Sequence, residues 1–458
     1  MESMIWFLGI LATLLTLELL NAAYSLSAKP FAAVCLILLL AVTYQTWRQT
    51  EEGNHPIFLF MLFLILFQYG RLVSWAIFGN WSISNFNLTV PTPFAINSSE
   101  LKRTLILIPL SASFVYIGFF YRTGRRVFHF TENDDVRTFF GWLYVLTVPF
   151  TIYKSGSYLY YALHHGGYVA MYLHNGAAFK KVGLIIRAVS LLNTVAFMAY
   201  IIVEQRRQKL RFAIFVFIVI LLLELLVGYR GEFFEFLTFL WMTYNIKTNK
   251  SFRPATGLIA ATAFIFAAVG AEIFRRTNGV IKVNLVEYML RGQGVSFDVT
   301  AAAVMYYSRF HPHILSYLLN QFLLPYKLLS QFPKGSLFTL DLTAYLNPHI
   351  INYALGTGEA YVAHLYLIDG IPSVCAGSVV IGLLCRGLTS ARGMFARTMA
   401  YAILIWIPYM PRAGYLEAFA TSSKFLIVTT AAFGLYSIYS WIKYCIKHGI
   451  PGIAGSRG

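Results

Sequence analysis

Six arginines in the second half of the chain have the chemistry to hold an anionic ligand. Arg230 and Arg412 each lie at the end of an apolar run, in the sequences Gly-Tyr-Arg-Gly and Tyr-Met-Pro-Arg. The other four are Arg275, Arg276, Arg291 and Arg309. Arginine stays charged at cellular pH, and its planar guanidinium can bind phosphate oxygens through two hydrogen bonds. These residues therefore favour an anionic ligand, and a phosphorylated lipid could reach them from a bilayer.

A carboxylate and an imidazole follow a glycine turn further along the chain. Residues 356–366 contain Gly356 and Gly358, then Glu359 and His364, and this pattern is typical of a turn that opens a helix. Helix starts present free backbone N–H groups that suit anions. Carboxylates and imidazoles are also common proton acceptors in enzymes. Glu359 has a structural explanation as well, because an acidic residue in a first helical turn favours the helix dipole.

The composition indicates an all-α polytopic membrane protein. Hydrophobic residues make up 58% of the 458 residues and charged residues 12%, with a mean hydropathy of +0.63. Soluble proteins are about a quarter charged. A bilayer core needs about 20 apolar residues per helix. About twelve runs qualify, at residues 4–23, 30–47, 56–78, 103–121, 138–154, 183–203, 212–227, 232–246, 256–274, 369–385, 393–411 and 418–441. We expect one integral membrane domain over residues 1–458.

The charge distribution predicts the topology. The net charge of +17 could suggest a nucleic-acid partner, but cytoplasmic loops of membrane proteins collect Lys and Arg, so no nucleic acid is expected. Placing the basic clusters in the cytoplasm puts both termini there. The loops predicted on the other side are 79–102, 155–182, 228–231, 275–358 and 412–417. The arginines named above then lie on the face that normally holds few.

Residues 275–358 form the longest segment between two predicted spans, the ninth and the tenth. Apolar residues from Ile314 to Tyr326 recur at helical spacing with polar residues between them, which predicts a helix lying on the membrane interface. Packing against the helix bundle is the alternative. Either arrangement makes a wall over a cavity that the arginines would line. The spans 212–227 and 232–246 are short, so the turn between them would be recessed and Arg230 would lie at the floor of this cavity.

Several charged and aromatic residues have simpler explanations. Arg71 lies inside the third span, so it should face the protein interior, in a structural pair or in contact with a ligand, or extend toward the interface. The arginines of the outer face could likewise pair with Glu272, Glu287, Asp298 or Glu417. Tyrosines and histidines in residues 155–182 suit the membrane interface, and sugar stacking is the alternative.

Four motifs in the second half resemble the Wzy-type O-antigen or capsule repeat-unit polymerases. They are Gly228-Tyr229-Arg230-Gly231-Glu232, Arg291-Gly292-Gln293-Gly294, the run from Asn347 through Gly356-Thr357-Gly358-Glu359-Ala360-Tyr361, and Tyr409-Met410-Pro411-Arg412. The resemblance covers residues 212–417, together with the number of spans and the placement of the loops. No phosphate-binding glycine loop or zinc-binding helix motif argues for ATP-driven or metalloprotease chemistry instead.

The resemblance implies a glycosyltransferase of the bacterial inner membrane with a GT-C-like helical fold. It would join undecaprenyl-pyrophosphate-linked oligosaccharide repeats, as donor and acceptor, at the periplasmic face, which makes residues 275–358 a periplasmic loop. It implies no cofactor and no bound metal. The partners would be these lipid-linked oligosaccharides and the bilayer, and a chain-length regulator is a further candidate.

The resemblance also suggests roles for the site residues. The departing lipid pyrophosphate gains negative charge, which fixed arginines can stabilise. We expect Arg230 and Arg412 to bind the pyrophosphate, followed by Arg291 and Arg276. Glu359 is the first candidate for the general base and His364 the second. Two other functions fit the same features: an O-antigen ligase and a transporter or flippase of lipid-linked saccharide. The chain shows no internal repeat, which counts against a transporter.

Overall fold

The computed structural model describes residues 2–50, 55–78, 85–87, 93–95, 98–120, 133–165, 182–227, 230–247, 285–323, 337–346 and 358–448. These residues are almost entirely helical, and the described exception is an antiparallel ribbon of β1 (Asn85–Asn87) and β2 (Pro93–Ala95). Eight helices in the described part of the chain are long and apolar enough to cross a membrane. The chain is therefore a multi-pass membrane protein.

These eight helices correspond to eight of the twelve predicted spans. The predicted span 256–274 lies outside the described residues. The spans 138–154 and 232–246 fall within helices, α6 (Asp134–His164) and α11 (Arg230–Lys247), that are not among the eight. The span 393–411 is not one helix, because α19 (Met394–Leu404) is followed by a 3-10 helix, η5 (Ile407–Arg412), that contains Pro408 and Pro411. Proline lacks the N–H that an α-helix requires.

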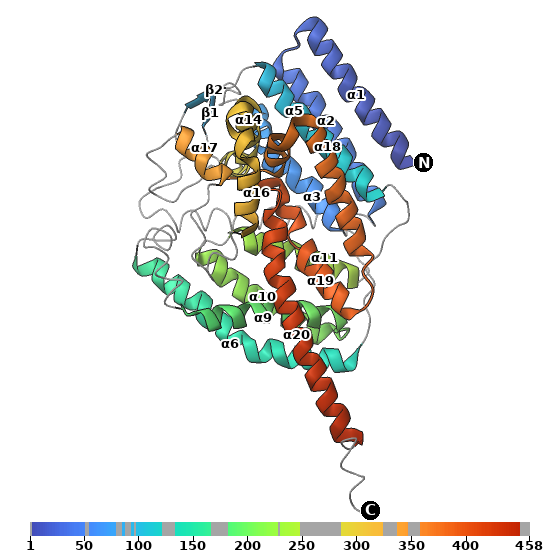
Figure 1. Cartoon of the computed structure of the whole chain (residues 1–458), viewed down its shortest axis with the longest axis vertical. Coiled ribbons are helices and arrows are strands. Elements are labelled where there is room, and N and C mark those ends of the chain that lie inside the picture. The colour runs from blue at the N-terminus through green and yellow to red at the C-terminus, as the bar shows by residue number, and fades with distance from the viewer. Residues whose placement is uncertain are drawn as a thin grey trace, which may run out of the picture. The chain divides into compact units, whose positions relative to one another are not determined.

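The described chain forms two compact units. Unit 1 comprises Met1–Phe128, Arg230–Ser390 and Leu404–Thr421, and unit 2 the remainder. Besides β1, β2, α11 and η5, unit 1 contains α1 (Glu2–Tyr24), α2 (Ala28–Gln49), α3 (Pro56–Leu64), η1 (Ile65–Tyr69), α4 (Gly70–Phe78), α5 (Ser98–Phe120), α13 (Leu285–Gln293), α14 (Val295–Met305), α15 (Tyr307–Phe310), η2 (His311–His313), α16 (Ile314–Leu323), α17 (Phe338–Leu346) and α18 (Tyr361–Thr389). Within it, α1, α2 and α5 run side by side (Figure 1).

Small residues let α5 and α18 approach closely. A Cβ built on Gly382 would meet the backbone nitrogen of Phe119 at 2.7 Å and would overlap the carbonyl oxygen of Val115. Gly118 likewise has no room for a side chain against the backbone of Val379. Ser111 and Ser378 hydrogen-bond across the same contact at 2.8 Å. Close packing and interhelical hydrogen bonds of this kind hold helices together inside a membrane.

We predict that Gly382→Ala lowers the free energy of unfolding of the protein by about 1–3 kcal/mol, the usual cost of overpacking. The added methyl group would meet backbone atoms, which cannot rotate away. Gly387→Ala is the matched control, because it lies in the same helix and a Cβ there meets nothing within 4 Å. Thermal unfolding of both variants in detergent tests this, and equal melting temperatures would show that the two helices can separate at no cost.

Helix α18 starts earlier than the predicted membrane span 369–385. The predicted span 369–385 was too short, because the helix begins at Tyr361, directly after the glycine turn, in which Gly358 has a φ of +83°. Asp369 and Gly370 have non-helical backbone angles, and Pro372 follows, so the helix is kinked there. The predicted span began at this break and left out the turns of the helix before it. The turn-then-helix pattern predicted for residues 356–366 is confirmed from Gly358 onward.

The described part of residues 275–358 consists of helices. Helix α14 is buried along nearly its whole length. The helix predicted from Ile314 is confirmed as α16, and its faces are informative: Tyr317 and Gln321 are buried, whereas Leu315 and Leu319 are 78% and 59% exposed. Exposed leucines on one face suit a helix in contact with lipid. The position of this segment at the outer face of the membrane stays a prediction.

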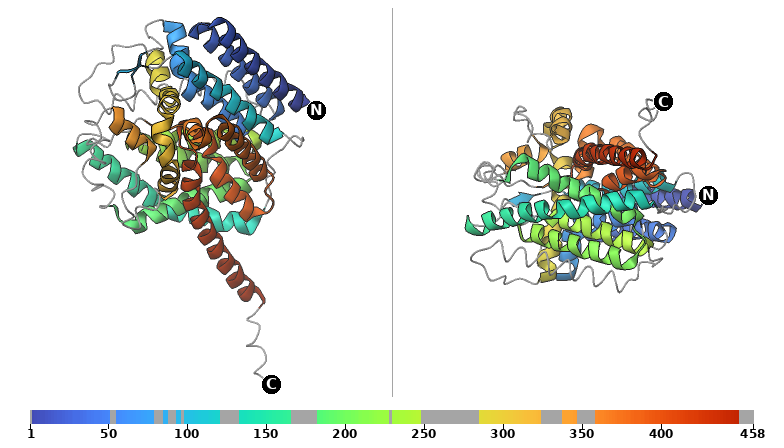
Figure 2. Two further views of the ribbon diagram at one scale, coloured as in Figure 1. Left: turned by 45° about the horizontal axis from the view of Figure 1, so that its top comes forward. Right: turned by 90° about the horizontal axis from the view of Figure 1, so that it is seen from below.

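Unit 2 contains α6, α9 (Leu184–Val203), α10 (Arg207–Val227), most of α19, and α20 (Glu417–His448) from residue 422 onward. Helix α6 packs against α9 and α10 (Figure 2). The prediction that this helix ends at residue 154 was wrong, because it continues to His164 through Gly156. Two tyrosines beyond Gly156 pack inward: Tyr158 and Tyr161 join a small core with Val182 and Val227, whereas Tyr160 is exposed. Lys154 pairs with Glu224 of α10 at 2.8 Å.

Candidate functional site

Arg412 lies at the end of η5, where three elements of unit 1 meet. Its Nη1 donates a hydrogen bond to Oε1 of Gln293 at the end of α13, and its guanidinium lies 5.6 Å from the centroid of the Phe67 ring. The preceding carbonyl, that of Pro411, accepts a hydrogen bond from Nε2 of the buried Gln68 at 2.9 Å. Among the described residues, these contacts of the guanidinium are all with uncharged groups. Within the described part of the chain, no contact pairs the charge of Arg412 with a carboxylate.

The contacts of Arg412 depend on a local irregularity in the third predicted span. Residues Ile65–Tyr69 form a single turn of π-helix, η1, between α3 and α4. Such turns are frequent at functional sites. This turn presents Phe67 and Gln68 to η5, and Oε1 of Gln68 also accepts a hydrogen bond from Thr300 of α14 at 3.1 Å. The extra residue in the turn thus positions the neighbours of Arg412.

Glu359 lies against the segment 414–416, which follows η5 and Arg412. Its side chain is 12% exposed, and Nε2 of Gln321 from α16 donates a hydrogen bond to its Oε2. Oε1 of that glutamine accepts from the backbone N–H of Leu416 at 3.2 Å. Because Gly414 also contacts both Gln321 and Glu359, the carboxylate lies against a turn that starts two residues after Arg412. Two residues of chain span at most about 7 Å.

The position of Glu359 differs from that of a dipole-stabilising residue. Helix α18 has Ala360 as its N-cap, so Glu359 precedes the helix rather than lying in its first turn. Burial raises the pKa of Glu359 well above its ordinary value of 4.5, and the negative charge of Glu417 raises it further. Hydrogen bonds from Gln321 and Gly414 act in the opposite direction. A carboxylate with a raised pKa is a stronger base than an exposed one.

His364 is buried next to Glu359. Its Nε2 lies 3.8 Å from Oε2 of Glu359, and the ring of Phe338 packs edge-on against it with centroids 5.7 Å apart. Neither ring nitrogen has a hydrogen-bond partner among the described residues. A buried polar group without a partner is costly. The two predicted candidates for the general base are thus neighbours.

The structure describes the other predicted arginines less fully. Arg230 is the first residue of α11, which packs against η5, and Arg291 lies in α13, two residues before the glutamine that binds Arg412. Their side chains lie outside the described residues, as does the whole of Arg276, together with Arg275. The guanidinium of Arg309 is 4.1 Å from the centroid of the Tyr345 ring.

Arg71 has the structural role that the sequence allowed. It pairs with Asp298 of α14, and their side chains are 9% and 0% exposed. We predict that Arg71→Met lowers the free energy of unfolding by about 3–5 kcal/mol, because it leaves a buried carboxylate without its partner. The double variant with Asp298→Leu should recover most of this loss. Thermal unfolding of both variants tests the pairing, and equal losses in single and double variants would show that the ion pair is not the cause.

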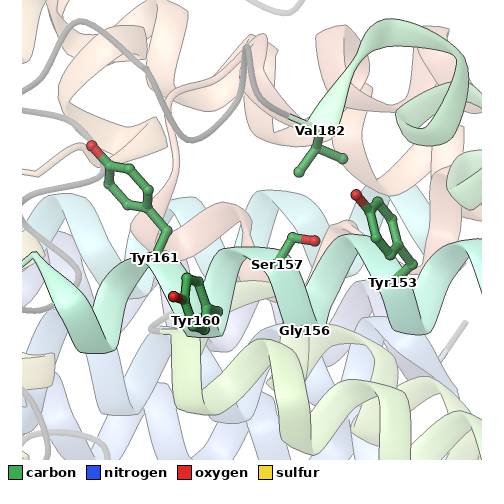
Figure 3. Close-up of a pocket in the computed structure, with 6 residues that line it drawn as sticks. All are labelled: Tyr153, Gly156, Ser157, Tyr160, Tyr161 and Val182. Carbon is green, nitrogen blue, oxygen red and sulfur yellow. The ribbon is translucent and has the colours of Figure 1, made fainter.

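Unit 2 contains a separate pocket. It has a volume of about 300 Å³ and is lined by Tyr153, Gly156, Ser157, Tyr160, Tyr161 and Val182. Figure 3 shows Tyr153 and Tyr161 on either side of Ser157, with Val182 opposite. These tyrosines belong to the region for which sugar stacking was the alternative, and that alternative stays a prediction. None of the six described lining residues is charged.

Three buried or half-buried glutamines were not predicted as site residues: Gln68, Gln293 and Gln321. Each makes a hydrogen bond to residues 411–416. Their neutral side chains carry no charge anomaly, so nothing in the local sequence marks them. The motif Arg291-Gly292-Gln293-Gly294 was the one available signal, and it directed attention to its arginine.

Comparison with known proteins agrees with the sequence motifs. A family model described as O-antigen polysaccharide polymerase Wzy matches residues 3–448, which is nearly the whole chain. No curated protein and no solved structure shows a significant match. The match extends well beyond residues 212–417, where the motifs were found, and includes both compact units. The chain therefore belongs to the O-antigen polysaccharide polymerase Wzy family.

Proposed function

We propose that this protein polymerises undecaprenyl-pyrophosphate-linked oligosaccharide repeats into O-antigen or a related surface polysaccharide. The observation that carries the proposal is that Glu359, with His364 at 3.8 Å, lies against Gly414, which is two residues along the chain from Arg412. A cation without a carboxylate partner among the described residues and a buried carboxylate are what this reaction needs. One holds the leaving pyrophosphate, and the other takes a proton from the acceptor.

In the proposed reaction, a hydroxyl of one lipid-linked repeat attacks the anomeric carbon of the other. The hydroxyl proton moves to Glu359, and the oxygen forms the new glycosidic bond. The bond between the anomeric carbon and the pyrophosphate oxygen breaks, and its electron pair stays on the lipid pyrophosphate. Arg412 stabilises the charge that develops there, together with Arg230, Arg291 and Arg276. His364 is the second candidate for the proton acceptor.

The membrane arrangement belongs to the same proposal. We place the site at the periplasmic face of the bacterial inner membrane, in one GT-C-like domain of about twelve spans over residues 1–458, with both termini in the cytoplasm. Residues 275–358 then form the long periplasmic loop between the ninth and tenth spans. A chain-length regulator is a candidate partner on this side.

The proposal is tested with purified protein in nanodiscs and a polyprenyl-pyrophosphate-linked repeat unit as the only substrate. A polymerase should lengthen the saccharide chain, as seen on a gel or by mass spectrometry. An O-antigen ligase would leave the repeat unchanged until lipid A-core is added, and a transporter would move it between leaflets without forming a bond. Either of these results would replace the proposed function.

A further inference from the structure

The turn between η5 and α20 packs directly against the carboxylate of Glu359. A side chain at Gly414 would overlap both Nε2 of Gln321 and Oε2 of Glu359. Only a residue without a Cβ fits this position, so the backbone of the turn reaches the carboxylate. Glu417, three residues further on, brings a second carboxylate to the same place.

A single backbone amide serves both carboxylates. The N–H of Gly414 donates to Oε2 of Glu417 at 3.1 Å and also stabilises the charged form of Glu359. The N–H of Glu417 donates in return to the carbonyl of Gly414 at 3.0 Å, which closes a turn at the start of α20. The bond from the Gly414 N–H to the Glu417 side chain is the half of a capping box that the glutamate supplies. Capping α20 would explain Glu417 alone. It does not explain a capping carboxylate beside a second buried carboxylate, where like charges repel.

Gln321 holds Glu359 in one orientation. It is 2% exposed, and both ends of its amide are used. The oxygen must face the Leu416 N–H, because that group is a donor, so the NH₂ group must face Glu359. The amide therefore presents a donor to the carboxylate and favours its ionised form. Shortening or removing this side chain would release both Glu359 and the turn.

We propose that Gln321 and Glu417 are positioning residues that act in opposite directions on the proton acceptor: Gln321 fixes and stabilises the ionised carboxylate of Glu359, and Glu417 opposes its ionisation. This inference rests on the proposed function. Among the described residues, Glu359 also has His364 from α18 beside it and the neutral Ser296 of α14, which donates to its backbone carbonyl at 3.1 Å, while Arg412 lies two residues before the turn. The balance between the amide and the second carboxylate sets the pH at which the base becomes active.

The test is the pH dependence of chain elongation by the purified full-length protein in nanodiscs. The probe is a polyprenyl-pyrophosphate-linked repeat unit extracted from cells that lack this chain. Glu417→Gln should move the midpoint of the rising limb to lower pH by about one unit, because a repelling charge is lost. Gln321→Leu should move it to higher pH, because a stabilising donor is lost. Glu417→Asp, which keeps the charge, should stay near the wild-type midpoint.

A purely structural role for either residue would lower the rate without moving the two midpoints in opposite directions. Unmoved midpoints, or shifts in the same direction, would overturn the inference. Glu100→Gln, an acidic residue in the first turn of α5, is the matched control and should leave the midpoint unchanged. If Gln321→Leu does not accumulate, Gln321→Met keeps the length of the side chain and is interpreted in the same way.

Glu359→Gln separates this inference from the proposed function. If that variant elongates chains at the wild-type rate, Glu359 is not the base and the catalytic assignment fails. If Glu359→Gln is inactive while the Glu417 and Gln321 variants keep the pH midpoint of the wild-type protein, only the inference on positioning fails.

Discussion

Replacing Arg412 with alanine is expected to abolish long polymer while the protein still accumulates in the membrane. The guanidinium has an uncharged hydrogen-bond partner, Gln293, and lies over the Phe67 ring, so the described structure does not depend on its charge for an ion pair. The charge that it would neutralise appears on the lipid pyrophosphate as the glycosidic bond forms. Losing one such donor typically lowers the rate of the chemical step by about 10²–10³-fold.

Two further variants make this result specific. Arg412→Lys keeps the positive charge but loses the planar fork, so we expect it to recover only part of the activity. Arg309→Ala removes an arginine of the same predicted outer face whose guanidinium stacks on Tyr345, and it should give near-normal chain lengths. Chain length is measured from the polysaccharide ladder at matched expression. Normal ladders from Arg412→Ala would remove this arginine from the mechanism.

The sequence predicted correctly those structural features that show as an unusual charge or as a regular spacing of apolar residues. Arg412 was singled out by its charge at the end of an apolar run and Glu359 by the glycine turn before it; the structure places Glu359 against the turn that follows Arg412, and the roles of both residues stay predictions. Helix α16 was predicted from its apolar spacing. Arg71 was expected to need a partner inside the membrane, and it has Asp298. In each case a strong physical cost or repeat is visible within a short window of sequence.

The supporting glutamines could not be predicted in the same way. Gln68 binds a carbonyl 343 residues away, Gln293 binds an arginine 119 residues away, and Gln321 binds an amide 95 residues away. A neutral amide has no preferred partner, so its contacts depend on tertiary packing alone. The π-helical turn that positions Gln68 is likewise invisible, because the sequence of η1 reads as an ordinary apolar helix.

Replacing Glu359 with glutamine is expected to lower the rate of chain elongation by about 10²–10⁴-fold, the usual contribution of a positioned base. The wild-type rate should rise with pH as the buried carboxylate ionises. Because the pKa of Glu359 is raised well above 4.5, this rise should occur at a higher pH than for an exposed glutamate. The variant should lose the rising limb as well as the rate. If the pH profile of Glu359→Gln is unchanged, whatever its absolute rate, another group takes the proton.

The same raised pKa makes a second, independent prediction about stability. A carboxyl group that binds its proton more tightly in the folded chain stabilises the fold while it is protonated. Its contribution is therefore complete below 4.5, the ordinary pKa, and is lost as the pH rises through the raised pKa of the folded protein. Glu359→Gln cannot ionise, so its melting temperature should fall less with rising pH than that of the wild type. If the melting temperatures of the two proteins change equally with pH, the carboxyl group is not buried as the structure places it, whatever its role in the reaction.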